Sequence, residues 1–328
     1  MRDRPVADVL GALLRHVRIT TGVFGRIELG APWGAKLGPR DTVSLHHLLE
    51  GEMWLELDGR ETRIGQGDVL ILPHGAPYAL RHQPGAPVED EASWQAPATP
   101  GALSMRRRHG GGGARTVLLC AELSMVGAAR ALLMRALPTV VRFPAGGSGE
   151  PVAGLGRLLD LLRDEVREPR RGSPLIAARL AELLLLQGIR EELERPAAAG
   201  SWRAALTDER IARALDALYG APERPWSVVT LARTAGMSRA AFAHRFRELV
   251  GESPFAHLTR WRMEVAKTML RERPGLTLGE VASSVGYSGE FAFSAAFRRV
   301  VGLPPGGYRA AVSEGPREDV PGEAGAFK

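Results

Sequence analysis

The chain contains one cysteine, Cys120, among its 328 residues. A single thiol excludes both an internal disulfide framework and a zinc site built from cysteines. Cys120 follows the apolar run 117–119, which predicts a buried structural thiol and not a nucleophile. No segment approaches the roughly 20 apolar residues that a membrane span needs, and residues 1–5 lack the apolar stretch of a signal peptide. These absences predict a cytoplasmic protein with no membrane partner.

Charge is distributed unevenly along the chain. It has 43 basic and 37 acidic residues, a net charge of +6, and the segment from Pro222 to Val312 holds 13 of the basic and 7 of the acidic ones. The rest of the chain is therefore balanced. A positive excess confined to one segment is typical of a surface that binds phosphate groups. An arginine-rich but merely solvated surface would give the same count, so charge alone does not decide between the two.

A repeat occupies the same basic segment. Residues 231–238 and 281–288 share one pattern of apolar and small residues around a glycine, and each is followed by two phenylalanines, a glycine and a proline. A short helix, a glycine turn and a longer helix, repeated at this spacing, predict a duplicated helix-turn-helix. The equivalent pairs are Gly236 and Gly286, Phe242 and Phe293, Phe246 and Phe297, Gly251 and Gly302, and Pro254 and Pro305.

The longer helix of each copy has a predicted outward face. We expect Ser238 and Ser288 to be the N-caps, and the phenylalanines to hold each helix to the core. Such helices can enter the major groove, where arginine pairs with guanine. The ten residues predicted to contact DNA are Arg239, Ala240, Ala243, His244 and Arg247 of the first copy, and Glu290, Ser294, Ala295, Arg298 and Arg299 of the second.

The first part of the chain is rich in strands. Residues from about 20 to 82 form short apolar segments broken by glycine, and Met53, Leu55 and Leu57 alternate with polar neighbours. Asp58 and Gly59 give a hairpin signal. Closely spaced strands of this kind predict a barrel or sandwich. Residues 83–114, rich in Pro, Gly and Ala, are predicted to be a loop, and residues 115–123 a further strand.

An amphipathic helix is predicted over residues 152–168, and a second helix over residues 173–195. Four successive leucines, Leu183 to Leu186, make the second apolar all round, so it must be covered on more than one side. Burial within the monomer and a dimer contact explain this equally well.

The last hundred or so residues resemble the DNA-binding domain of AraC/XylS-type transcriptional regulators. The resemblance rests on residues 281–288, on residues 293–299, and on Gly302, Pro305 and the pair 308–309. One departure is His257, where the family often has tyrosine. The resemblance implies that residues 239–250 and 289–300 are two recognition helices. It also implies double-stranded promoter DNA as a partner, with RNA polymerase as a further candidate.

The strand-rich part resembles a cupin through residues 51–59 and 67–75, and more closely the cupin-type sensor found ahead of AraC-type domains. A barrel of this kind can hold a small molecule. The expected effector-binding residues are His46, Met53, Trp54, His74 and Tyr78.

A metal-dependent enzyme is the main alternative for the barrel. It would gather histidines and carboxylates around a metal. However, His46 and His47 are adjacent, so on a strand they point to opposite faces, and Tyr78 stands where a cupin metal site would usually carry histidine. We therefore predict no metal ligands, no catalytic residues and no cofactor.

The sequence predicts an α+β multidomain protein. The expected parts are a cupin-like β-barrel sensor over residues 1–150, a helical extension for dimerisation and a linker over 151–221, an all-α double helix-turn-helix over 222–312, and a disordered tail over 313–328. The predicted function is sequence-specific transcriptional regulation by a homodimer that responds to an unidentified small effector. A metal-dependent cupin enzyme fused to a DNA-binding domain, and a constitutive DNA-binding protein with an inert barrel, are the alternatives.

Overall fold

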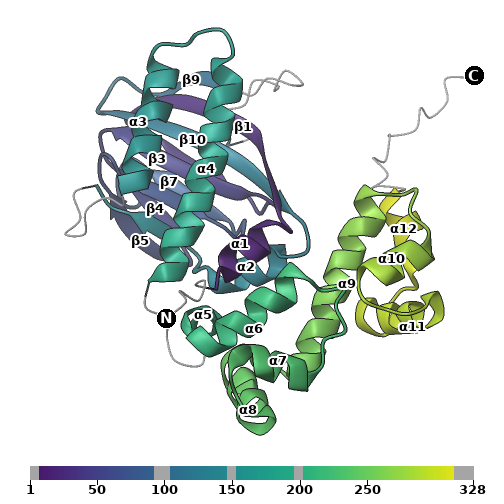
Figure 1. Cartoon of the computed structure of the whole chain (residues 1–328). Helices are drawn as coiled ribbons and strands as arrows, with labels where there is room; N and C mark the ends of the chain where they lie inside the picture. Colours follow the sequence, from purple (N-terminus) through teal and green to yellow (C-terminus); the bar gives the residue numbers. More distant parts are fainter. Residues whose placement is uncertain (1–6, 92–103, 146–152, 196–201, 314–328) are drawn as a thin grey trace, which may run out of the picture. The chain divides into compact units, whose positions relative to one another are not determined.

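The computed structural model describes residues 7–91, 104–145, 153–195 and 202–313, and it divides into two compact units (Figure 1). One unit is Val17–Thr207, and the other combines Met1–His16 with Asp208–Lys328. No helix in the described part of the chain is both long enough and apolar enough to cross a membrane.

Two β-sheets form the first unit. The larger sheet has the strand order β11-β6-β3-β10-β1-β9, and the smaller has the order β5-β4-β7-β2-β8. The larger sheet consists of β1 (Arg18–Gly30), β3 (Val43–Glu50), β6 (Val69–Leu72), β9 (Ser104–Gly110), β10 (Arg115–Val126) and β11 (Val141–Phe143). The smaller consists of β2 (Gly34–Leu37), β4 (Met53–Leu57), β5 (Arg60–Ile64), β7 (Tyr78–Arg81) and β8 (Glu89–Asp90).

The core of this unit draws on both sheets. Leu29, Leu48 and Leu118 of the larger sheet belong to the same buried cluster as Met53 and Leu80 of the smaller one. The alternation predicted for β4 is present in the structure. Met53 and Leu55 are buried in this core, whereas Trp54, Glu56 and Leu57 are partly exposed. The strand-rich fold predicted for this part of the chain is confirmed.

The prediction of an unbroken loop over residues 83–114 was wrong. Two strands lie there, β8 and β9. β9 pairs in parallel with β1, from Phe24 opposite Ser104 to Gly30 opposite Gly110. Its sequence, with three arginines, has no apolar alternation, so the local pattern could not reveal a strand whose partner lies about 80 positions earlier.

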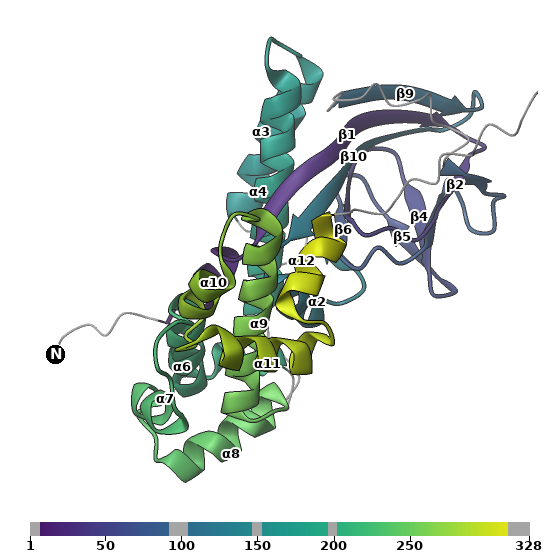
Figure 2. The ribbon, with the colours of Figure 1, turned by 90° about the vertical axis from the view of Figure 1, so that its right-hand side faces the viewer.

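Helices complete the first unit. They are α2 (Arg130–Ala136), α3 (Ala153–Arg167), α4 (Ser173–Glu194) and α5 (Trp202–Thr207). α3 and α4 pack side by side, and α4 lies against β1 and β10 of the larger sheet (Figures 1 and 2). Thr21 of β1 donates its hydroxyl hydrogen to the Ala178 carbonyl of α4 at 2.9 Å. The chain itself therefore covers one side of the leucine-rich helix: Leu184 and Leu185 are buried, whereas Leu183 is 47% exposed.

The second unit is entirely helical. Its helices are α1 (Val9–Leu14), α6 (Glu209–Gly220), α7 (Val228–Ala235), α8 (Arg239–Val250), α9 (Pro254–Glu272), α10 (Leu278–Ser284), α11 (Glu290–Val301) and α12 (Pro305–Ser313). Apart from Ser313, which ends α12, the predicted disordered tail 313–328 lies outside the described residues.

Two segments belong to a different part of the fold than their sequence neighbours. The sequence places the N-terminus with the barrel and residues 208–221 with the linker, but α1 packs on α6 and both belong to the helical unit. His16, just after α1, has its Nε2 3.1 Å from the Tyr219 carbonyl oxygen and its ring edge-on to Trp261. These contacts span more than 200 positions, and local sequence patterns do not contain them.

α9 leads from the first helix-turn-helix to the second (Figures 1 and 2). The unusual His257 is buried on its first turns. Its Nε2 is 2.7 Å from the Tyr219 hydroxyl oxygen, and its Nδ1 is 2.7 Å from a Glu252 carboxylate oxygen. Histidine at this position thus joins α6 to the loop before α9.

Candidate functional site

The first helix-turn-helix consists of α7 and α8. Ser227 and Thr230 form a capping box at the start of α7, and Gly236 makes the turn with φ +66°. Ser238 then caps α8, and its hydroxyl accepts from the Ala241 amide. Phe242 and Phe246 are fully buried. The opposite face of α8 is therefore directed away from the core of this unit.

The second copy, α10 and α11, has the same order with a different cap. Thr277 and Glu280 form a capping box on α10. The prediction that Ser288 caps α11 was wrong: Gly289 is the N-cap, with no side-chain hydrogen bond. The second copy carries one extra residue after its serine, which moves Ser288 one position out of the cap.

All ten residues predicted to contact DNA lie on the outer faces of α8 and α11. Eight of them are exposed, and Ala243 and Ser294 are half-buried. Phe293 and Phe297 anchor α11 from the other side. One further residue on this face, Phe291, was not predicted. Its side chain is 90% exposed, and the 51-residue offset between the copies, which pairs it with Ala240, could have identified it.

The arginines of these faces differ from their neighbours in pairing. Within the described part of the chain, Arg239, Arg247 and Arg298 make no ion pair or hydrogen bond to another side chain. Arg245, which lies on α8 with Arg239 and Arg247, forms ion pairs with Asp208 at 2.9 Å and with Glu248 at 3.0 Å. Unpaired guanidinium groups on an exposed helix face are available to phosphates and guanine edges.

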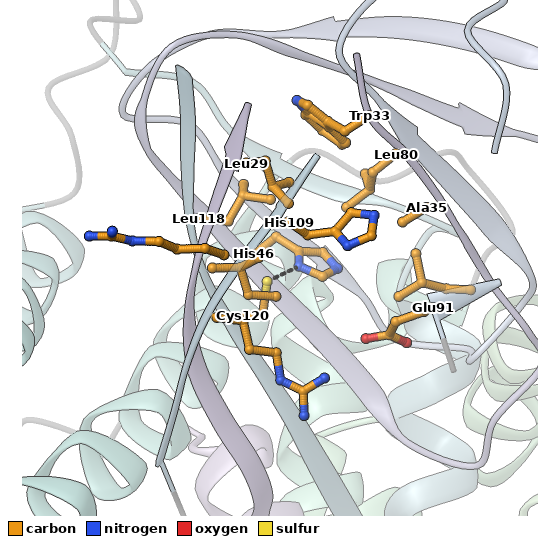
Figure 3. Close-up of a pocket in the computed structure, with 13 residues that line it drawn as sticks. Leu29, Trp33, Ala35, His46, Leu80, Glu91, His109, Leu118 and Cys120 are labelled. Atoms are coloured by element: carbon orange, nitrogen blue, oxygen red, sulfur yellow. Dashed lines mark hydrogen bonds between the residues drawn. The ribbon is translucent and has the colours of Figure 1, made fainter. Parts of the chain in front are cut away.

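A cavity of roughly 260 Å³ lies in the barrel of the first unit (Figure 3). Its walls are mostly apolar and come from six strands and from two residues outside them, Trp33 and Glu91. The lining residues are Ile27, Leu29, Trp33, Ala35, Leu37, His46, Leu80, Glu91, Arg107, Arg108, His109, Leu118 and Cys120. Figure 3 shows the His46 and His109 rings near each other, with Glu91 on one side.

His46 and Cys120 are two of the polar residues that line this cavity, which also include Glu91 and three residues of β9. His46 and Cys120 are register partners on β3 and β10. His46 Nδ1 lies 3.1 Å from Cys120 Sγ, and its Nε2 lies 2.6 Å from the Tyr78 hydroxyl oxygen. Burial, with the Arg40 guanidinium nearby, lowers the pKa of His46 to about 4. Burial also raises the pKa of Cys120 and of Tyr78. At neutral pH the cluster is therefore an uncharged hydrogen-bonding group.

The five predicted effector residues are not all brought together. His46 lines the cavity, and Tyr78 lies behind it through their hydrogen bond. Met53 is fully buried in the core, Trp54 pairs with Arg81 on the smaller sheet, and His74 Nε2 lies 3.1 Å from the Leu137 carbonyl oxygen. These last three do not line the cavity. The β9 residues that do line it were missed, because residues 83–114 were interpreted as a loop.

The adjacent histidines point apart, as predicted from strand geometry. His47 does not line the cavity. Its burial, and to a smaller extent the positive charge of Arg163 on α3, lower the pKa of His47 to about 4. No group of three or more His, Cys, Asp or Glu side chains suited to a metal occurs among residues 7–91, 104–145, 153–195 and 202–313.

Comparisons with known proteins complete this description. The Cupin family matches residues 8–194, and the Helix-turn-helix domain family matches residues 231–311. An AraC-like transcription regulator of Streptomyces lividans is 34% identical over 312 residues, which cover 93% of this chain and 97% of that protein. The HTH-type transcriptional regulator AlkR of Acinetobacter baylyi is 24% identical over 311 residues, covering 92% and 99%.

Among solved structures, the DNA-binding domain of AdpA, a global transcriptional factor, in complex with a target DNA is 33% identical. The match covers 32% of this chain and 96% of that one, with a TM-score of 0.31. The named relatives are regulators and not enzymes. The chain belongs to the AraC family of DNA-binding transcriptional regulators, with an N-terminal cupin domain and a C-terminal helix-turn-helix domain.

Proposed function

We propose that this protein is a cytoplasmic, sequence-specific transcriptional regulator that binds a small effector in the barrel and acts on promoter DNA as a homodimer. The observation that carries the effector proposal is the cavity with a mostly apolar wall and a small number of polar side chains, among them the hydrogen-bonded pair His46 and Cys120. Ligand sites in proteins typically combine these two features. The relatives named as transcription regulators support the proposal that the protein regulates transcription, and RNA polymerase is a candidate partner at the promoter.

The size and lining of the cavity suggest the class of effector. Known ligand pockets span about 300–1,000 Å³, so a cavity of roughly 260 Å³ suits a small molecule. Leucine side chains and Trp33 favour an apolar or aromatic body. His46 offers a hydrogen bond, and Arg107 on β9 favours an acidic group. We therefore propose a small aromatic or aliphatic acid.

Filling the cavity tests this proposal. Ala35 lines it and is buried, so Ala35→Leu places three further carbons inside. In a thermal-shift screen of small aromatic and aliphatic acids, we expect one to stabilise the wild type, by about 2.7 kcal/mol at a hundredfold excess over its Kd. Ala35→Leu should abolish that stabilisation. Lys36→Leu, exposed on the same strand, is the control and should retain it. Stabilisation that survives Ala35→Leu places the ligand elsewhere.

The homodimer proposal rests on α4. Its buried face packs on the sheet, whereas Leu175, Ile176 and Leu183 are 54%, 46% and 47% exposed. Ile176 and Leu183 are seven residues apart, which places them on one side of the helix two turns apart. A second copy related by a twofold axis would cover this stripe with the same stripe of its own.

Charges introduced on this stripe should dissociate the dimer. In Ile176→Glu/Leu183→Glu, like charges would face each other across the twofold axis. We expect the wild type to sediment as a dimer and the variant as a monomer in analytical ultracentrifugation. Lys36→Glu, an exposed change on β2 of the smaller sheet, is the control and should remain dimeric. Equal masses for all three proteins would exclude α4 as the interface.

A further inference from the structure

Phe291 is the most exposed of the large apolar side chains in the described part of the chain, with 90% of its surface open to solvent. A phenyl ring held in water gives up the free energy that burial would provide. It lies in the first turn of α11, one residue after Glu290 and two after the N-cap Gly289. Its ring contributes nothing to the core of this unit, so α11 folds without it.

The repeat shows what this position does in the other copy. The buried phenylalanines are offset by 51 residues, 242 to 293 and 246 to 297. The same offset places Phe291 opposite Ala240, and Ala295 opposite His244. The N-terminal residues of a recognition helix are those that contact base edges. Phe291 thus occupies a base-contacting position by the geometry of its own repeat.

The face around Phe291 is apolar at its start and basic at its end. Phe291, Ala295 and Arg298 follow one another at spacings of four and three residues, which is one side of a helix. All three are exposed, whereas Phe293, Ala296 and Phe297 face inward. In the first copy, the equivalent positions are Ala240, His244 and Arg247. The two recognition helices therefore present different chemistry.

Thymine is the base with an apolar group on its major-groove edge, the 5-methyl group. We propose that Phe291 contacts a thymine methyl group, with Ala295 beside it and Arg298 on the adjacent phosphate or base. This inference rests on the proposed sequence-specific binding. The half-site bound by α11 is then selected by apolar contact with thymine, and the half-site bound by α8 by hydrogen bonds from Arg239 and His244.

Deoxyuridine provides the test, because it differs from thymidine by that methyl group alone. The full chain is used to select binding sites from a random duplex library, and each thymine of the selected site is then replaced by deoxyuridine. At one thymine of one half-site, we expect about fourfold weaker binding of the wild type, as for loss of one buried methyl group. Phe291→Ala should bind the thymine site more weakly and show no further loss with deoxyuridine. Phe255→Ala, an exposed phenylalanine of α9, should behave as wild type.

The outcomes separate this inference from the proposed function. If the wild type selects no sequence, sequence-specific binding fails, and the inference fails with it. If a site is selected but no thymine methyl group matters, or the methyl effect persists in Phe291→Ala, the inference is overturned and sequence-specific binding stands. Normal DNA binding by Phe291→Ala, with loss only of transcription activation, would also overturn it and assign the ring to a protein partner.

Discussion

Gly286→Ala is expected to destabilise the helical unit much more than Gly236→Ala, although the two glycines are equivalent in the repeat. Both have positive φ, +66° at Gly236 and +78° at Gly286, a conformation that costs other residues about 1–2 kcal/mol. At Gly236 the nearest atom to an added Cβ is 3.9 Å away. At Gly286 the Cβ would lie 2.4 Å from Arg262 Nη2 and 2.6 Å from the Glu223 carbonyl oxygen.

Arg262 cannot easily move aside for this methyl group. It is buried on α9, donates to the Pro222 carbonyl at 2.8 Å and the Arg224 carbonyl at 2.7 Å, and lies over the Tyr287 ring. Hydrogen bonds from a charged group are each worth about 1.5–3 kcal/mol. We therefore expect Gly236→Ala to cost about 1–2 kcal/mol and Gly286→Ala at least about 3 kcal/mol.

Calorimetry of the full chain measures this difference as the fall in Tm of the helical unit. Gly236→Ala is the matched control, because its expected cost comes only from the positive-φ backbone conformation and not from a close contact. Equal shifts for the two variants would show that Arg262 yields without cost.

Loss of Arg247 and Arg298 together should weaken DNA binding about 30-fold or more. Each arginine is exposed on its recognition helix, and the 51-residue offset makes the two equivalent. One arginine contact to a base is worth about 1–3 kcal/mol, or roughly fivefold in affinity at the lower end. Because the two residues lie on separate helices, the effects of the single Arg→Ala changes should add.

The salt dependence of binding distinguishes the two kinds of contact. An arginine on a phosphate should, when removed, lower the slope of log K against log salt by about 0.9, with sequence preference kept. An arginine on guanine should leave the slope and relax the preference at one base pair. Arg245→Ala is the control on α8, because that guanidinium is bound to Asp208 and Glu248. Unchanged affinity of both single variants in a gel-shift assay at moderate salt would contradict the assigned face.

The helical unit was largely predictable because its signals are local. Spacing of the phenylalanines set which side of α8 and α11 is buried, and both helices lie within one residue of their expected ends. Period-two geometry likewise separated His46 from His47. Each of these features depends on residues within two turns or one strand of each other, a range in which periodicity determines direction.

The cavity depended on tertiary structure. Its lining comes from strands that are far apart in the chain, such as β1 and β9, and their register is set by pairing and not by local pattern. The alternation along β4 correctly predicted that the Met53 side chain points inward. The side chain packs in the filled core, however, and does not line the cavity. Alternation distinguishes inside from outside, but it does not distinguish a filled interior from a hollow one.

The sequence alone was sufficient for the duplicated helix-turn-helix, its outward faces and the barrel that precedes it, because these follow from short-range periodicity. Only the folded chain separates Gly286 from Gly236, brings β9 to the cavity and packs α1 on α6. Each of these depends on an atom contributed from a distant segment, such as Arg262 beside Gly286. Equivalent motifs in one sequence acquire different constraints because their three-dimensional neighbours differ.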